Sequence, residues 1–384
     1  MRLLFHAGRV TLIMTSSQIS LSAGVIRTDL PMSDGRTIRY YDSEKQSRSA
    51  KDLRPVEVQP GIGELRLDPL VNEWVAMAAH RQGRIFLPPK ELCPLCPSSV
   101  DLLTEIPDSN YEVVVFDNRS PSLRPPDSNF QIPNELNFDT PIVPAAGKCE
   151  VVCYAADHGK SFKDLSAKQI RTVMEAWRNR VKELSSEDFI AHIFPFENRG
   201  EEVGVTLSHP HGQIYAYSYL TPRVEKMLAV AQAHKTRTGR VLLDDVIARE
   251  IKDKVRIVAQ NADWIAYVPY ASRYPFEIHL APKKSVSDMA ELSDVQADSF
   301  SIISQEVFRR LDGVFGIEMA YIAAWHQAPV RVGRDVLRLH LQICSVRRQP
   351  NKLKYLAGSE SAMGAFIMDM KPEQSAQQLR EVKL

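Results

Sequence analysis

The chain has 384 residues, of which 48 are Lys or Arg and 47 are Asp or Glu, so its net charge is +1 with histidine neutral. This balance argues against a nucleic-acid partner, because nucleic-acid binding needs clustered cationic side chains that displace counterions from phosphates. No run of about 18 or more apolar residues occurs, so we expect no membrane span and no membrane partner. The length suits two domains or one duplicated fold.

The cysteines are few and irregularly spaced, which does not suit a disulfide framework. They are Cys93, Cys96, Cys149, Cys153 and Cys344. Reduced thiols or a metal site fit this usage, so we expect a cytoplasmic protein.

The first half of the chain is predicted to begin with an unstructured segment and to continue with strands. Residues 1–55 are rich in Ser, Arg and Asp, and we expect a poorly ordered N-terminal extension. After Gly63 the alternating pattern predicts two strands joined by a turn at Asp68-Pro69. A proline-rich loop follows, and then strands over 111–116 and 149–154.

A helix is predicted to start after Ser166, because serine is a favourable cap and apolar residues then recur at helical spacing. The recurring residues are Ile170, Val173, Met174, Trp177 and Val181. Strands are predicted over 189–198 and 211–220, and one long helical stretch over 222–250.

The same order of elements then recurs, which indicates an internal duplication. Glu277 follows Glu150 by 127 positions, and Gln342 follows Gln213 by 129. The repeated segments are strands over 264–270, 276–282, 319–329 and 337–346, with a helix starting at Leu292-Ser293. We therefore predict an α+β protein with two joined antiparallel half-barrel sheets and helices outside. The two halves are expected to span 56–221 and 222–384.

The clearest chemical signal is the run Ser208-His-Pro-His-Gly-Gln213. Alternate residues of a strand point to one face, so His209, His211 and Gln213 are expected to share a face. Gly212 would let a ligand approach the backbone. The alternative interpretation is a pair of hydrogen-bonded structural histidines.

This run is similar to the histidine-triad superfamily, and Gln213 in place of a third histidine resembles its galactose-1-phosphate uridylyltransferase branch. Further matching runs, spread over residues 63–384, are NEWVAMAAHRQGR, VVVFDN, CYAADHGKSF, FPFENRGEEVG, VPYASRYPFEIHLAP and AAWHQAP. The resemblance implies the same duplicated, histidine-triad-like fold.

The resemblance also implies a two-step transfer of UMP from UDP-glucose to galactose 1-phosphate. In the first step His211 would attack the α-phosphorus, because a neutral imidazole is a competent nucleophile near pH 7. Gln213 would donate a hydrogen bond to a phosphoryl oxygen without activating water.

Other substrate-binding residues are implied by position within the family's motifs. The candidates are Arg81 and Arg84 for phosphate, Asn118 for the nucleotide, Asn198 beside the reacting phosphate, Gly204 as a further substrate-binding residue, and Lys354, Gly358 and Glu360 for the hexose. Phe366 and Ser359 depart from the family's hexose-binding pattern, so the sequence does not define the preferred sugar epimer.

The sequence raises the question of two metal sites, one for zinc and one for iron. The pair Cys93 and Cys96 could be a redox pair, free thiols or half of a tetrahedral zinc site. The family implies His158 and His209 as the other ligands, giving one structural zinc per chain.

The family can also hold iron in its C-terminal half through one Glu and three His. Here only His326 and His340 match, because Gln342 and Leu228 take the other positions. We expect this second site to be absent or weak.

The resemblance further implies a homodimer. Two alternative functions remain open. One is a related sugar-nucleotide phosphorylase or adenylyltransferase, which would pass a nucleotidyl group from a substrate such as ADP-glucose to inorganic phosphate. The other is a zinc-stabilised nucleotide-binding protein without turnover, in which His211 would be structural.

Overall fold

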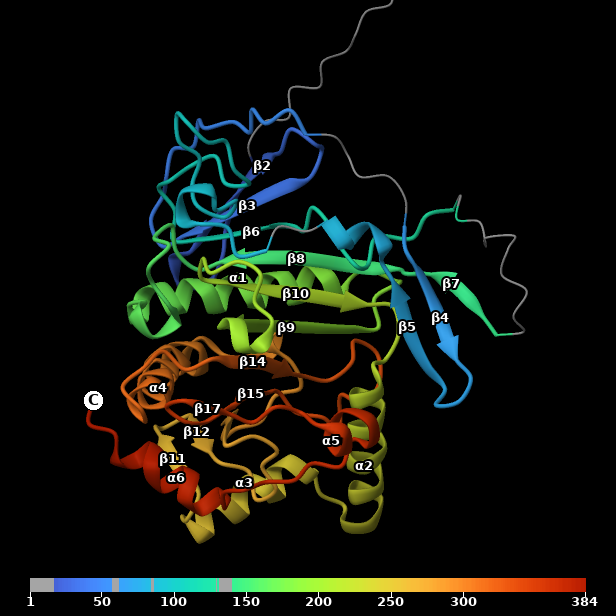
Figure 1. Ribbon diagram of the computed structural model, residues 1–384, viewed down its shortest axis with the longest axis vertical. Helices are drawn as coiled ribbons and strands as arrows, with labels where there is room; N and C mark the ends of the chain where they lie inside the picture. Colours follow the sequence, from blue (N-terminus) through green and yellow to red (C-terminus); the bar gives the residue numbers. More distant parts are fainter. Residues whose placement is uncertain (1–16, 57–61, 84–85, 129, 131–139) are drawn as a thin grey trace, which may run out of the picture.

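One antiparallel sheet of twelve strands runs through both halves of the chain in this computed structural model (Figure 1). The structure describes residues 17–56, 62–83, 86–128, 130 and 140–384. The strand order is β1-β2-β3-β6-β8-β10-β9-β14-β15-β13-β12-β11. The predicted α+β class with antiparallel strands is confirmed, and the two half sheets are continuous with each other.

The elements of the N-terminal half are β1 Ser17–Ser20, β2 Ile26–Pro31, β3 Thr37–Asp42, β4 Glu64–Asp68, β5 Glu73–Met77, β6 Val113–Asp117, β7 Ile142–Pro144, β8 Gly147–Cys153, α1 Ala167–Ser185, β9 His192–Arg199 and β10 His211–Tyr217. Those of the C-terminal half are α2 Pro222–Thr238, α3 Leu242–Asp253, β11 Ile257–Gln260, β12 Trp264–Tyr267, β13 Phe276–Pro282, α4 Asp294–Gly313, β14 Tyr321–His326, β15 His340–Ser345, β16 Arg347–Gln349, β17 Lys352–Leu353, α5 Gly358–Met363 and α6 Pro372–Glu381.

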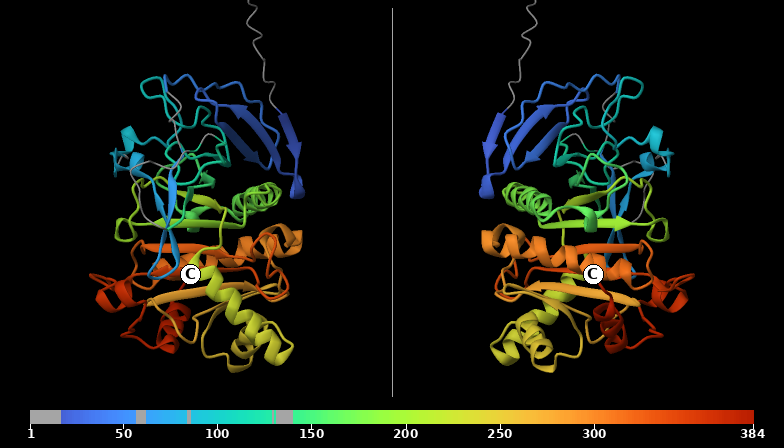
Figure 2. Two further views of the ribbon diagram at one scale, coloured as in Figure 1. Left: turned by 90° about the vertical axis from the view of Figure 1, so that its right-hand side faces the viewer. Right: turned by 90° about the vertical axis from the view of Figure 1, so that its left-hand side faces the viewer.

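Helices α1 and α4 cover one face of the sheet, and β4 and β5 lie on the opposite side (Figure 2). Helix α1 starts as predicted, because the Ser166 side chain accepts a hydrogen bond from the Gln169 backbone N–H at 3.1 Å. Its apolar side packs into the largest buried cluster, where Trp177 and Trp325 meet edge to face. The opposite face carries a smaller apolar cluster that includes Tyr40 and Phe116, beside the polar side chain of Gln213.

The two halves join where β9 pairs with β14. Phe196 lies opposite Ala324, which continues a row from Gln213 on β10 to Gln342 on β15. All four residues point to the face away from α1 and α4. Gln213 and Gln342, the corresponding residues of the two halves, therefore share one face of one sheet.

The predicted correspondence between Glu150 and Glu277 is wrong by one residue. Val151 pairs with Gln213, and His279 pairs with Gln342, so Val151 and His279 are the equivalent positions. A slip of one residue moves a side chain to the other face of a strand. Glu150 accordingly binds Arg180 of α1 at 2.5 Å on the helical face, whereas Glu277 lies on the polar face.

The prediction of a poorly ordered extension over residues 1–55 is wrong for residues 17–55. Strand β3 pairs with β6, and Ile38, Tyr40 and Tyr41 are buried. The Tyr41 hydroxyl donates to the Asn179 side chain of α1 at 2.7 Å. The charged residues of this segment form ion pairs, such as Arg48 with Asp42, so composition alone was misleading. Residues 1–16 lie outside the described residues.

The predicted helical stretch over 222–250 consists of two helices. Gly239 ends α2 with φ of 72°, a left-handed conformation that suits glycine, and α3 starts at Leu242.

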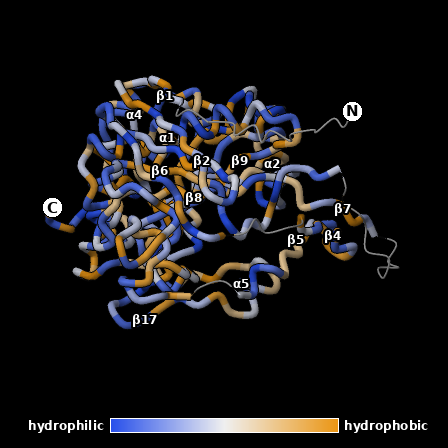
Figure 3. The backbone as a smooth tube through the Cα atoms, turned by 90° about the horizontal axis from the view of Figure 1, so that it is seen from above, coloured by the Kyte–Doolittle hydropathy of each residue, from blue (hydrophilic) through white to orange (hydrophobic). Residues whose placement is uncertain are grey.

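Hydrophobic and hydrophilic segments alternate along the whole described chain (Figure 3). None of its described helices combines the length and the apolar character needed to cross a bilayer.

Candidate active site

His211 is the first residue of β10 and lines two cavities of about 360 and 380 Å³. We name them by their asparagines: the Asn198 cavity also contains Ser161 and Arg199, and the Asn118 cavity also contains Gln213. Both volumes lie within the range of ligand pockets, about 300–1,000 Å³. His211 is thus positioned to react with a group held in either cavity.

The imidazole of His211 is held in one orientation by the backbone before it. Its Nδ1 lies 2.7 Å from the carbonyl oxygen of His209. A carbonyl oxygen only accepts, so we assign the proton to Nδ1 and the lone pair to Nε2. Burial lowers the pKa of His211, and the bond to His209 opposes that shift. A neutral imidazole with a free Nε2 is suited to nucleophilic attack.

The Asn118 cavity has apolar walls and two amide side chains. Phe116 and Leu95 contribute apolar surface, and Gln213 and Asn118 contribute donors and acceptors. The Asn118 Oδ1 also accepts from the Ser120 backbone N–H at 2.9 Å. Such a combination suits a flat heteroaromatic ring with a polar edge.

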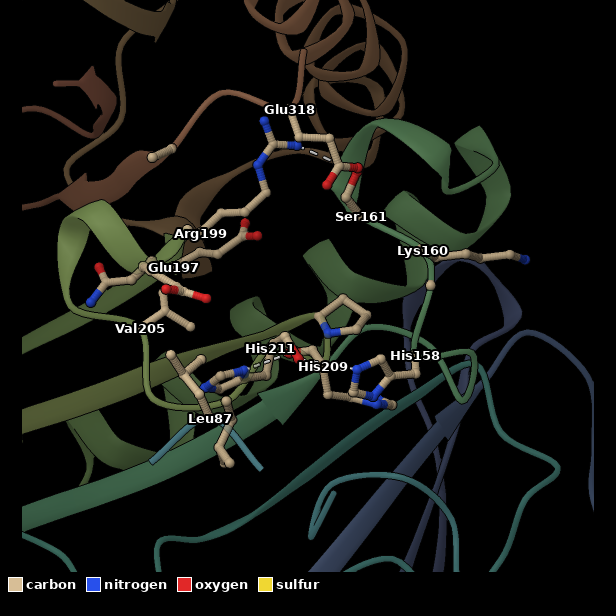
Figure 4. Close-up of a pocket in the computed structure, with 18 of the residues that line it drawn as sticks. Leu87, His158, Lys160, Ser161, Glu197, Arg199, Val205, His209, His211 and Glu318 are labelled. Atoms are coloured by element: carbon tan, nitrogen blue, oxygen red, sulfur yellow. Dashed lines mark hydrogen bonds between the residues drawn. The ribbon is translucent and has the colours of Figure 1, made fainter. Parts of the chain in front are cut away.

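The Asn198 cavity contains a buried carboxyl group that the sequence did not single out (Figure 4). Glu197 accepts a hydrogen bond from the Tyr321 hydroxyl at 3.0 Å. Burial raises the pKa of Glu197 to about 7, while Arg199 and the Tyr321 hydrogen bond act in the opposite direction. The Arg199 guanidinium itself donates to Asp312 at 3.1 Å and to the Met319 carbonyl. Arg199 is therefore already engaged by the protein.

Gly212 does not have the role predicted for it. It faces the helical side of the sheet, where a Cβ atom would lie 1.9 Å from the Tyr154 hydroxyl oxygen. The missing side chain makes room for Tyr154, and no space for a ligand is created.

Four side chains come together beside His211: Cys93, Cys96, His158 and His209, with one ligand atom from each within 4.8 Å of every other. The Cys96 Sγ lies 3.3 Å from His158 Nδ1 and 3.5 Å from His209 Nδ1. Tetrahedral bonds of about 2.0–2.3 Å require separations of about 3.6 Å between such atoms. The group can therefore hold a metal ion.

The outer nitrogens of both histidines have partners, as metal-binding imidazoles usually do. His209 Nε2 lies 2.9 Å from the Ala155 carbonyl oxygen, and His158 Nε2 lies 3.1 Å from the Ser208 hydroxyl. His209 precedes the strand, and its ring turns toward His158 and away from His211 (Figure 4). The expectation that His209, His211 and Gln213 share one strand face is thus correct only for the last two.

Some predicted residues do not line either cavity of His211. Arg81 donates to the Tyr215 hydroxyl at 3.2 Å, two positions beyond Gln213 on β10. Gly204 has φ of 80° and precedes Val205, which does line the Asn198 cavity. Arg84 lies outside the described residues.

The predicted hexose-binding residues lie in the C-terminal half. The Lys354 ammonium donates to Glu360 at 2.8 Å, and Gly358 begins α5. Figure 1 shows α5 in the C-terminal half, whereas His211 is at the start of β10 in the N-terminal half. One chain alone does not bring these residues to the nucleophile.

His340 of the C-terminal half has the same Nδ1 contact as His211, but its Nε2 is hydrogen-bonded within the protein. His340 Nδ1 lies 3.0 Å from the Arg338 carbonyl oxygen, but its Nε2 is bonded to the Gln342 amide at 3.0 Å. The Gln342 Oε1 accepts from the Arg223 guanidinium at 2.8 Å. Leu228 packs against an apolar cluster. The His340 ring lies beside those of His326 and His279, and His279 Nε2 is 3.0 Å from a Glu277 carboxylate oxygen. The expectation of an absent or weak iron site stays a prediction.

Comparison with known proteins gives a family for both halves. Sequence models described as "Galactose-1-phosphate uridyl transferase, N-terminal domain" and the corresponding C-terminal domain match residues 61–221 and 227–384. A galactose-1-phosphate uridylyltransferase of Streptomyces lividans is 39% identical over 373 residues, covering 93% of this chain and 98% of the relative.

Solved structures agree with the sequence comparison. A structure described as uridylyltransferase has a TM-score of 0.73 and 29% identity, covering 83% of this chain and 98% of that one. An ADP-glucose phosphorylase from Arabidopsis thaliana with bound ADP-glucose has a TM-score of 0.63 and 25% identity, covering 84% and 100%.

The raised pKa of Glu197 predicts a specific pH dependence of stability. The folded state binds this proton more tightly than the unfolded state, so stability falls as pH rises from 4.5 toward about 7. Glu197→Gln cannot ionise and avoids this loss, which amounts to about 3 kcal/mol. Free energies of unfolding, measured by denaturant titration at about pH 5 and about pH 8, should show the variant gaining relative to the wild type.

The matched control is Glu318→Gln, which changes a carboxyl group of the same cavity whose side chain is 69% exposed. It should follow the wild type at both pH values. Parallel pH dependence of Glu197→Gln and the wild type would contradict the assignment.

Proposed function

Because the chain belongs to the galactose-1-phosphate uridyl transferase family, we propose that it transfers a uridylyl group from UDP-glucose to galactose 1-phosphate through a covalent intermediate on His211. The observation that carries the proposal is the His211 imidazole, which lies between two cavities. Its Nδ1 is bonded at 2.7 Å, and its Nε2 has no hydrogen-bond partner among the described residues.

In the first step Nε2 of His211 attacks the α-phosphorus of UDP-glucose. An N–P bond forms, the P–O bond to the second phosphate breaks, and glucose 1-phosphate leaves with the electron pair on oxygen. The second pKa of a phosphate monoester is about 6, so this group leaves without a strong general acid. In the second step a phosphate oxygen of galactose 1-phosphate attacks the same phosphorus, the N–P bond breaks, and UDP-galactose forms.

Gln213 favours transfer of the uridylyl group to a sugar phosphate over hydrolysis of the intermediate. Its amide can donate to a non-bridging phosphoryl oxygen but has no basic group that could activate water. Placement of uridine in the Asn118 cavity and of the hexose phosphate toward Asn198 and Gly204 leaves phosphorus next to both His211 and Gln213. Arg81 and Arg84 are proposed to contact phosphate, which suits the guanidinium fork.

We also propose that the enzyme works as a cytoplasmic homodimer. Lys354, Gly358 and Glu360 line neither cavity of His211 in one chain. A second copy could supply them, which would place the hexose segment of one subunit at the nucleophile of the other.

The metal is proposed to be one structural zinc ion per chain, held by Cys93, Cys96, His158 and His209. Four protein ligands leave no open position for substrate. The zinc would fix His209, whose carbonyl oxygen orients His211.

A second candidate is favoured by the likeness to a solved ADP-glucose phosphorylase. The nucleophile would be the same, and inorganic phosphate would be the acceptor. Separate incubations with UDP-glucose and ADP-glucose distinguish the two, because the released glucose 1-phosphate reports which nucleotide is cleaved.

The covalent intermediate should be trapped by UDP-glucose labelled at the α-phosphorus. Label should remain on the denatured wild-type chain, and His211→Ala should carry none because the attacking nitrogen is gone. His234→Ala is the control, since His234 pairs with Asp245 in the C-terminal half and lines neither cavity of His211. Label on the His211→Ala chain would remove His211 as nucleophile.

Metal analysis of the purified enzyme should find about one zinc per chain. Cys96→Ser should lose the metal and at least about 3 kcal/mol of stability, because structural zinc binding contributes directly to folding. Cys344→Ser, which changes a thiol of the C-terminal half, should retain both. Full zinc content in Cys96→Ser would exclude the proposed ligand set.

A shared site predicts complementation between two inactive variants. His211→Ala and the double variant Lys354→Met/Glu360→Gln should each lack transferase activity. Mixed dimers would contain one intact site, so dissociation and reassociation of an equal mixture should restore about a quarter of wild-type activity. No recovery, despite mixed dimers seen by native mass spectrometry, would place both residue sets in the same subunit.

A further inference from the structure

Strand β3 and the turn between β2 and β3 help to form a further polar cavity, next to the Asn118 cavity. It has a volume of about 300 Å³ and shares Asn118 and Arg119 with that neighbour. Lys148 of β8 contributes to its opposite wall. The family match begins at residue 61, so the wall made by β3 and the turn before it lies outside the match.

The lining of this cavity is predominantly cationic. Its charged residues are Arg36, Arg39, Arg119, Arg124 and Lys148, against Asp34 and Asp117. Arg36 is occupied by Asp34 and by Glu105, at 2.7 and 2.6 Å, and so joins the β2–β3 turn to the rest of the protein. Lys148 is paired with Glu187 at 2.7 Å. Arg39 and Arg119 still give the lining two guanidinium groups against the single carboxylate of Asp117, so the cavity favours an anion.

Arg39 is largely buried but makes few hydrogen bonds within the protein. Its side chain is only 14% exposed, yet Nη1 lies 3.5 Å from the Thr37 carbonyl oxygen and 3.8 Å from Asp117. Its Nε has no hydrogen-bond partner among the described residues. A buried guanidinium normally makes several short charge-assisted bonds, because the loss of hydration is otherwise uncompensated.

Asp117 competes only weakly with a bound anion for the Arg39 guanidinium, because its pKa is raised. Burial raises the pKa of Asp117, and repulsion from Glu150 raises it further. Arg119 is exposed at the boundary with the Asn118 cavity. An anion between Arg39 and Arg119 would therefore meet two guanidinium groups.

We propose that this cavity binds the phosphoryl group of a small phosphorylated ligand, with Arg39 and Arg119 as its principal contacts. The guanidinium fork matches phosphate oxygens in pairs. The volume exceeds that needed for a bare phosphate, so a hexose phosphate is accommodated as well. Because Asn118 and Arg119 belong to both cavities, occupancy of one should alter nucleotide affinity in the other, and the effect must be reciprocal.

The test measures binding of inorganic phosphate and of glucose 1-phosphate by calorimetry, with saturating UDP present to occupy the nucleotide cavity. The wild-type enzyme should bind at least one of these probes at one site per chain. Arg39→Met keeps the apolar stem and removes the charge, so its affinity should fall by about tenfold or more. Arg39→Lys should retain part of the affinity.

The control is Arg66→Met, because Arg66 lies on β4, pairs with Glu64 and is outside the cavity. It should bind the probe as the wild type does. Denaturant unfolding of each variant establishes that it is folded. Equal affinity in folded Arg39→Met, or binding that UDP abolishes, would overturn the proposal. Stronger binding of glucose 1-phosphate than of phosphate would identify the ligand as a sugar phosphate, and equal binding as free phosphate.

Discussion

The hydrogen bond from His211 Nδ1 to the His209 carbonyl oxygen is the constraint on which the proposed chemistry depends. It assigns the reactive lone pair to Nε2. The His209 ring is turned into the group that also contains Cys96, and its Nε2 faces the Ala155 carbonyl oxygen. A metal ion in that group would therefore act on catalysis through the backbone, by fixing the oxygen that orients the nucleophile.

The two faces of the duplicated sheet are packed differently. Helices α1 and α4 cover one face. His211, Gln213, His340 and Gln342 lie on the other, which also carries smaller apolar clusters. The C-terminal half keeps the orienting bond at His340, but Gln342 occupies its Nε2 and Arg223 holds Gln342 in turn. The same backbone geometry thus holds the proposed nucleophile in one half and a saturated hydrogen-bond chain in the other.

Features that depend on a local sequence pattern could be predicted from the sequence. Features that depend on tertiary packing could not. The helix capped by Ser166 and the order of the strands follow from periodicity and capping. The correspondence between Glu150 and Glu277 could not be predicted in this way. A near-constant offset in sequence leaves an uncertainty of one residue, and one residue decides which face of the sheet a side chain occupies. The strands within residues 17–55 were missed because the segment has a charged composition typical of disorder. In the fold, its charged side chains form ion pairs, such as Arg48 with Asp42. Lys354 and Glu360 could not be placed at His211 at all, since in one chain they line neither of its cavities.

The most direct measurement of the central claim is NMR of the enzyme labelled with ¹⁵N in its histidine rings, with His211 assigned by comparison with a variant lacking it. The account predicts a neutral ring with hydrogen on Nδ1 and none on Nε2, and loss of this single state when a chelator removes the metal. A proton on Nε2 in the intact enzyme, or a spectrum of His211 unchanged by metal removal, would contradict it.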